Sequence, residues 1–164
     1  MKSLLPLVLW AICASAYSLT IDEIAGKWVV DIDATMSLMK EQYRKKMPPG
    51  MDENGLAMQI EPRRGMLANR IFEFAPQTIL VHQERDGAMM DEQNITITSK
   101  IADKDALIVE CQIPRLKTDS ETTKQEVQNI KLVLRLRGDR LEMDTGKNGQ
   151  VIVLLRPVAD AAKP

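Results

Sequence analysis

The second half of the chain alternates between apolar and polar residues in short runs. In residues 94–101, isoleucines occupy one face of an extended chain, and threonine and lysine side chains occupy the other. The isoleucines are Ile95, Ile97 and Ile101, and the polar residues are Thr96, Thr98 and Lys100. Because successive side chains of a strand point to opposite faces, this pattern predicts a sheet with one buried face and one wet face.

Runs of this kind recur along the chain and are separated by turn residues such as Gly, Pro and Asp. They cover residues 26–33, 71–74, 79–84, 94–101, 107–113, 130–137, 141–143 and 151–155. Short strands at close intervals, without helical crossovers between them, are typical of antiparallel sandwiches and barrels. We therefore predict a mainly β fold, an antiparallel up-and-down meander of about eight strands, and its closure into a barrel would remove the exposed edges.

Residues 34–47 follow a helical period instead. Their apolar side chains recur every three or four positions: Met36, Met39, Tyr43 and Met47. Asp33 is a suitable N-cap, and the Pro48-Pro49-Gly50 sequence ends the helix. The sequence thus predicts one helical insertion after the first strand. Residues 51–70 contain Gly55, Pro62 and Gly65, and we expect a loop with one or two helical turns that lies against the strands.

The N-terminus has the pattern of a cleavable export signal. Lys2 precedes an apolar run that ends at Cys13, and Ala14-Ser15-Ala16 provides small residues at the cleavage site. This run is too short to cross a bilayer, which disfavours an uncleaved anchor, and Ile12 disfavours a lipid-modified Cys13. We expect residues 1–16 to be a signal peptide, residues 17–158 to be a single β-barrel domain and residues 159–164 to be a disordered tail. The protein would then be exported, either periplasmic or secreted.

Charge and cysteine content narrow the possible partners. The chain has 22 Lys and Arg residues against 23 Asp and Glu residues, a net charge of −1. This balance argues against nucleic acid or an anionic membrane as the main partner, while a protein partner remains open. After cleavage only Cys111 would remain, so we expect no internal disulfide. Its place in an alternating run favours a buried small hydrophobe over a reactive thiol.

The sequence offers little catalytic equipment. His82 is the single histidine, and with Cys111 it cannot supply a zinc or copper site, so we predict no metal and no cofactor. We expect His82 to be a surface or hydrogen-bonded residue. Met36 and Met39, with Met89-Met90, present a copper(I) alternative, but helix packing also explains the first pair. No nucleophile, phosphate-loop or metalloprotease motif is present, and no catalytic residue is predicted, so the chain is expected not to be an enzyme.

The Gly26-Lys27-Trp28 sequence resembles the Gly-x-Trp motif that opens the first strand of the lipocalin (calycin) superfamily, here in a small secreted bacterial form. The resemblance implies that Trp28 closes one end of an eight-stranded barrel and that Arg156, after the last strand, packs over it. It also implies a cavity for one apolar small molecule. The chain departs from the family in lacking its disulfide, its Thr-Asp-Tyr turn near Gly138 and its long helix after the last strand.

The predicted function is that of an exported, non-enzymatic protein that binds an apolar small molecule or lipid. The inward positions would be Ile95, Ile97, Leu107, Val109, Ile130, Leu132 and Leu134. Five methionines would form the lid and mouth of the pocket: Met36, Met39, Met51, Met58 and Met66. The segment from Met51 to Leu67 would act as an adjustable lid. The alternative is a surface interaction module with a filled barrel, which binds a protein or an envelope component.

Overall fold

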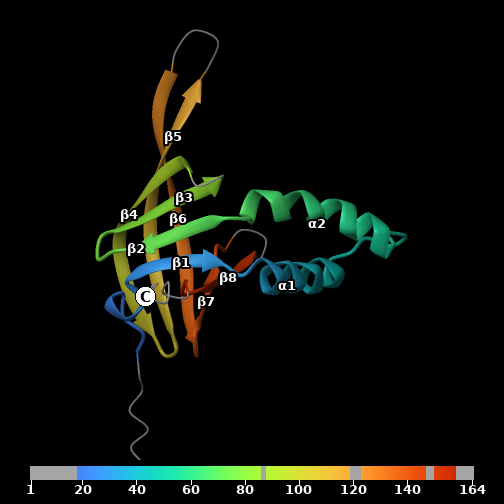
Figure 1. The fold of residues 1–164 in the computed structure, drawn as a ribbon, viewed down its shortest axis with the longest axis horizontal. Coiled ribbons are helices and arrows are strands. Elements are labelled where there is room, and N and C mark those ends of the chain that lie inside the picture. Colours follow the sequence, from blue (N-terminus) through green and yellow to red (C-terminus); the bar gives the residue numbers. More distant parts are fainter. Residues whose placement is uncertain (1–17, 86–87, 119–122, 147–149, 158–164) are drawn as a thin grey trace, which may run out of the picture.

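The computed structural model describes residues 18–85, 88–118, 123–146 and 150–157. The predicted signal peptide and the predicted tail lie outside these residues. The described chain forms eight strands (Figure 1): β1 (Gly26–Val30), β2 (Arg70–Phe74), β3 (Thr78–Arg85), β4 (Ala88–Asp103), β5 (Ala106–Thr118), β6 (Thr123–Arg137), β7 (Arg140–Asp144) and β8 (Val151–Leu155). Each strand pairs antiparallel with the next, and β1 pairs with β8, which closes the barrel. The predicted meander and barrel are confirmed.

The seam between the first and last strands is short. β1 and β8 pair through Val29 with Leu155 and Val30 with Leu154. Beyond these pairs, the backbone N–H of Asp31 donates to the Val153 carbonyl at 2.8 Å. The buried hydroxyl of Thr35 then accepts a 2.9 Å hydrogen bond from the Val153 N–H. A helix side chain therefore completes the edge of β8 where β1 has ended.

Alternate residues of the strands fill the barrel interior. The predicted inward positions Ile95, Ile97, Leu107, Val109, Leu132 and Leu134 are buried, and Ile130 is half-buried against the same core. Ile101 is an exception, because it is exposed. A bulge between Ile97 and Ser99 shifts the register, so that Ile101 pairs with Ile108 on the outer face. Strict alternation fails there because one extra residue exchanges the two faces of the strand.

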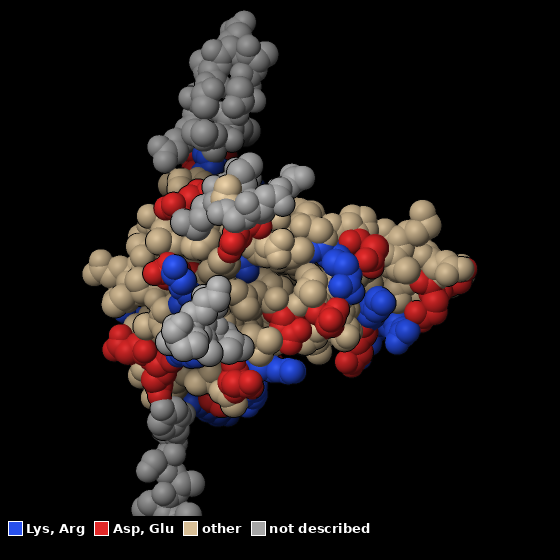
Figure 2. Space-filling view, in the orientation of Figure 1, with Lys and Arg blue, Asp and Glu red and all other residues tan. Residues whose placement is uncertain are grey.

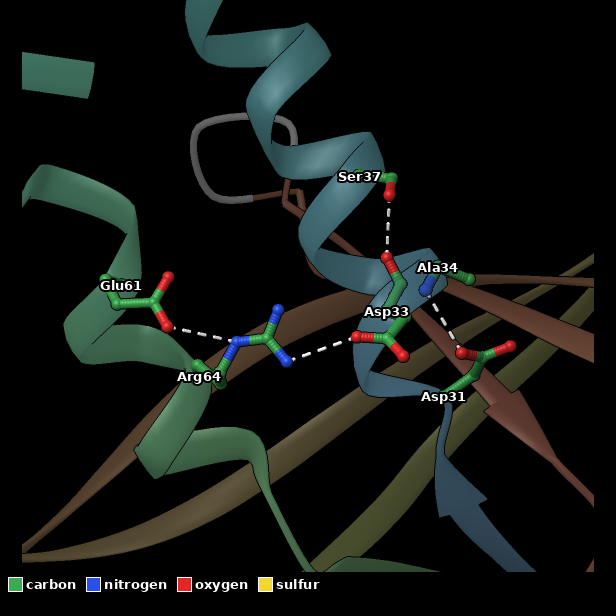
Figure 3. A network of polar contacts seen from close by, with 6 residues as sticks. All are labelled: Asp31, Asp33, Ala34, Ser37, Glu61 and Arg64. Atoms are coloured by element: carbon green, nitrogen blue, oxygen red, sulfur yellow. Dashed lines mark hydrogen bonds and ion pairs between the residues drawn. The ribbon is translucent and has the colours of Figure 1, made fainter. Parts of the chain in front are cut away.

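The first helix, α1 (Ile32–Lys45), begins two residues earlier than the sequence predicted. Its N-cap is Asp31, whose carboxylate accepts a 3.1 Å hydrogen bond from the Ala34 N–H. The predicted cap, Asp33, lies in the first turn. Figure 3 shows its carboxylate directed towards Arg64, which also contacts Glu61; both contacts are 3.1 Å long.

The expectation of a loop over residues 51–70 is wrong. Residues Glu53–Leu67 form a helix, α2, whose N-cap Asp52 accepts a hydrogen bond from the Gly55 N–H. Pro62 lies inside this helix, where it costs about 3 kcal/mol relative to alanine. Burial of Leu56, Ile60 and Leu67 along one helix face offsets this cost. Packing of the helix on its neighbours therefore overrides its weak intrinsic propensity.

The two helices form a hairpin beside the barrel (Figure 1). Arg44, near the end of α1, makes a two-point ion pair with Glu53 at the start of α2, with contacts of 2.7 and 2.8 Å. The hydrogen bond from Arg44 lowers the pKa of Glu53. Met36 and Met39 of α1 join the same hydrophobic core as the barrel residues. Neither helix is long and apolar enough to span a bilayer within the described residues.

Candidate functional site

One end of the barrel is closed by the pair that the sequence resemblance singled out. Trp28 is fully buried, and its indole N–H donates to the Ile24 carbonyl at 2.7 Å. Ile24 belongs to a short 3-10 helix, η1 (Asp22–Ile24). The guanidinium carbon of Arg156 lies 4.6 Å from the centre of the Trp28 ring. A guanidinium nitrogen of Arg156 also donates to the Glu23 carbonyl at 2.8 Å, so Arg156 connects Trp28 with η1.

The glycine of the same motif has a conformational role. Gly26 has a φ of +103°, a value that residues with a side chain rarely adopt. This conformation lets the chain turn from η1 into β1. A Cβ atom on Gly26 would also lie 3.9 Å from a guanidinium nitrogen of Arg156. Gly26 therefore sets the backbone conformation beside Arg156, and Trp28 supplies the ring that Arg156 covers.

Above this end, the middle of the barrel is filled by its own side chains. Among the described residues, the inward side chains of the closed end and of the middle of the barrel are exposed by at most 6%: Trp28, Phe72, Phe74, Ile79, Ile95, Val109, Leu132, Leu134, Leu141 and Leu154. If the barrel held a cavity large enough for a ligand, a water molecule inside it could touch the side chains that line it, and these side chains would count as exposed. A ligand must therefore bind elsewhere than in this layer.

A pocket of about 520 Å³ opens at the other end of the barrel. Five of its residues are apolar: Met66, Leu67, Ile113, Ile130 and Ile152. The others are polar or charged: Arg63, Arg70, Arg115, Gln128, Thr145 and Gln150. The strand residues come from the beginnings of β2 and β8 and from the middle of β5 and β6, while α2 contributes Arg63, Met66 and Leu67.

The inward rows of the barrel change chemistry as they reach this pocket. On β6 the inward row runs from Leu132 through Ile130 to Gln128. On β2 it runs from Phe72 to Arg70. The pocket thus has an apolar floor that joins the core and a rim of amide and guanidinium groups. Such a surface suits a molecule with one apolar and one polar end.

One polar group at the pocket lacks a partner. The side-chain oxygen of Gln128 is buried and accepts no hydrogen bond within the described structure. A buried polar group without a partner costs about 1–3 kcal/mol. Since Gln128 lines the pocket, a small rotation of its amide would let a bound molecule or a water supply the missing hydrogen bond.

The structure brings one of the five predicted methionines to this pocket. Met66 lines it, whereas Met58 lies elsewhere on α2 and is 79% exposed. Met36 and Met39 are buried in the core, as the packing interpretation of α1 expected. Met51 lines a smaller hollow of about 250 Å³ between the helices, together with Tyr43 and Leu56.

Comparison with known proteins adds nothing to this picture. No family model, curated protein or solved structure matches the chain.

The other candidate reactive groups are placed for packing. Cys111 is buried among the barrel residues, as predicted, and desolvation raises its pKa from 9.0 to about 11. It is thus a thiol, and a poor nucleophile, at neutral pH. His82 is 5% exposed and lies at a bulge in β3, so of the two expected roles, a surface residue or a hydrogen-bonded one, burial excludes the first. Among the described residues, no three His, Cys, Asp or Glu side chains lie close enough to hold a metal ion.

The sequence did not single out the polar part of the pocket, namely Arg63, Arg70, Arg115 and Gln128. A signal for three of them exists in the period of the strands. The inward rows that contain Phe72, Val109 and Leu132 continue to Arg70, Arg115 and Gln128, respectively. All three look like ordinary polar strand residues until the pairing register is known. Arg63 depends on α2, whose helical form was not predicted.

Proposed function

We propose that this protein is an exported, non-enzymatic binder of an apolar small molecule or lipid, and that the ligand occupies the pocket at the open end of the barrel. The observation that carries the proposal is the apolar floor of that pocket, formed by Ile113, Ile130 and Ile152. Its volume of about 520 Å³ falls within the range of about 300–1,000 Å³ that is usual for small-molecule sites.

The closed end supports a lipocalin-like architecture for this function. The fully buried Trp28, the stacked Arg156 and the order of the eight strands agree with the resemblance carried by the Gly-x-Trp motif. The filled middle of the barrel distinguishes this protein from a deep-cavity carrier. The ligand would therefore lie in a shallow site, with α2 along one side.

The proposal is tested by fluorescence titration of the purified protein with the neutral dye N-phenyl-1-naphthylamine, whose fluorescence intensity increases in apolar sites. We expect saturable binding that Met66→Asp weakens by about tenfold or more, because the variant places a charge at an apolar contact. Met58→Asp is the matched control, since Met58 lies on the same helix but does not line the pocket. No saturable binding, or equal loss in both folded variants, would contradict the proposal.

A second candidate function is protein binding through the ends of β5 and β6, which project beyond the barrel (Figure 1). The β4–β5 ladder ends at Gln112, and the β6–β7 ladder begins at Val133. The projecting part of the β5–β6 ribbon is thus paired only within itself in the described structure. Open strand edges of this kind accept an added strand from a partner.

A further inference from the structure

The lining of the pocket is basic, in contrast to the mixed charge of the helix hairpin. Basic and acidic side chains are interspersed over the helix hairpin in Figure 2. The pocket, in contrast, is lined by Arg63, Arg70 and Arg115 and by no carboxylate among the described residues. A net charge of −1 for the whole chain makes this local excess of cations a specific feature of the site.

Two neighbouring arginines of α2 have different partners. Arg64 is neutralised by Asp33 and Glu61 on the side of α2 that faces the start of α1 (Figure 3). Arg63 has no carboxylate partner within the described structure; its guanidinium lies 5.3 Å from the centre of the Tyr43 ring. This contact ties the Arg63 guanidinium to α1 without neutralising its charge.

The other two arginines of the pocket, Arg70 and Arg115, extend from strands of the barrel. Neither side chain has an ion pair or hydrogen bond among the described residues. Glu126 lies directly opposite Arg115 in the β5–β6 ladder, so Arg115 has a carboxylate as its cross-strand neighbour. Arg63 and Arg70 are therefore the two cations most available to a ligand.

Gln128 provides an independent indication of a polar ligand group. Gln128 lines the same pocket as the arginines, and its buried amide oxygen has no hydrogen-bond partner within the described structure. A half-turn of the amide exchanges its oxygen and nitrogen positions at little cost in shape. The amide N–H₂ would then donate to a ligand oxygen, alongside the arginines.

We propose that the ligand is an anionic amphiphile, with its alkyl part on the isoleucine floor and its carboxylate or phosphate head between Arg63, Arg70 and the Gln128 amide. This inference rests on the proposed function and specifies its ligand class. Arginine suits such a head because its planar N–H groups bind two oxygens at once. The same cations disfavour a positively charged head and give a neutral head no charge-assisted bond.

The experiment compares four twelve-carbon ligands below their micelle concentrations by displacement of N-phenyl-1-naphthylamine: dodecanoate, dodecyl phosphate, dodecanol and dodecyltrimethylammonium. We expect at least one of the two anions to bind about tenfold or more tightly than dodecanol, as one charge-assisted hydrogen bond provides. The tighter of the two anions identifies the head group. The cationic ligand should bind most weakly.

Single variants then locate the head group. Arg63→Gln and Arg70→Gln should each reduce the preference for the anion by about tenfold and leave dodecanol binding unchanged. Arg135→Gln, on the outer face of β6 opposite Glu142, removes the same charge away from the pocket and should change neither. Equal binding of anions and dodecanol, or equal effects of all three variants, would overturn the inference while the proposed function stands. Failure of the dye and of every ligand to bind would overturn both.

Discussion

At the residue scale, the sequence was most informative where one local requirement fixes several atoms. Gly26 and Trp28 could be singled out through the Gly-x-Trp resemblance, and the structure gives the reason for the two residue types, a left-handed backbone at Gly26 and a buried indole at Trp28. Arg63 and Arg70 could not, because an arginine on a helix or at a strand end is usually a solvated side chain. Its role at the pocket depends on neighbours that are distant in the sequence.

Cys111 makes the stability of the barrel depend on pH. Because burial raises its pKa from 9.0 to about 11, the folded state disfavours the thiolate. The resulting stability is complete below pH 9 and is lost as pH rises towards 11. Two pKa units correspond to about 2–3 kcal/mol.

The measurement is chemical denaturation of the wild type and Cys111→Ala between pH 8 and pH 11. We expect the wild type to lose more free energy of unfolding than the variant over this range, since the variant shares every lysine and tyrosine but lacks the thiol. Parallel pH profiles for the two proteins would show that Cys111 is not desolvated in the folded state.

At the element scale, the strands were predictable and the second helix was not. Period-two runs identify strands because one face must be buried, and they correctly gave the number and order of the barrel strands. α2 was missed because Gly55, Pro62 and Gly65 lower its intrinsic propensity, while its stability comes from contacts with α1 and the barrel. The bulge after Ile97 was missed because it depends on pairing with β5.

The seam between α1 and β8 gives a test at this scale. Thr35→Val keeps the shape of the side chain but removes the hydroxyl that accepts from the Val153 N–H. The N–H would then be buried without a partner, and we expect the free energy of unfolding to fall by about 1–3 kcal/mol. Urea denaturation measures this loss. Thr35→Ser, which retains the hydroxyl, should fall by less; a smaller loss in Thr35→Val than in Thr35→Ser would contradict this account of the seam.

At the scale of the whole molecule, the barrel was predictable but the place of its pocket was not. The sequence expectation put the ligand under a methionine-rich lid that includes Met51 and Met58. In the structure, Met51 lies between the helices and Met58 is exposed. The pocket draws its lining from α2 and from several strands, and such a combination becomes visible only when the register of every pair is known.

The most direct test of the proposed function is an NMR titration of the ¹⁵N-labelled protein with dodecanoate. We predict saturable shifts of the backbone amides that line the pocket, from Met66, Arg70, Ile113, Gln128 and Ile152, with small changes near Trp28 at the closed end. The absence of saturable shifts, or shifts confined to the hollow between the helices around Tyr43 and Met51, would contradict a ligand site at the open end of the barrel.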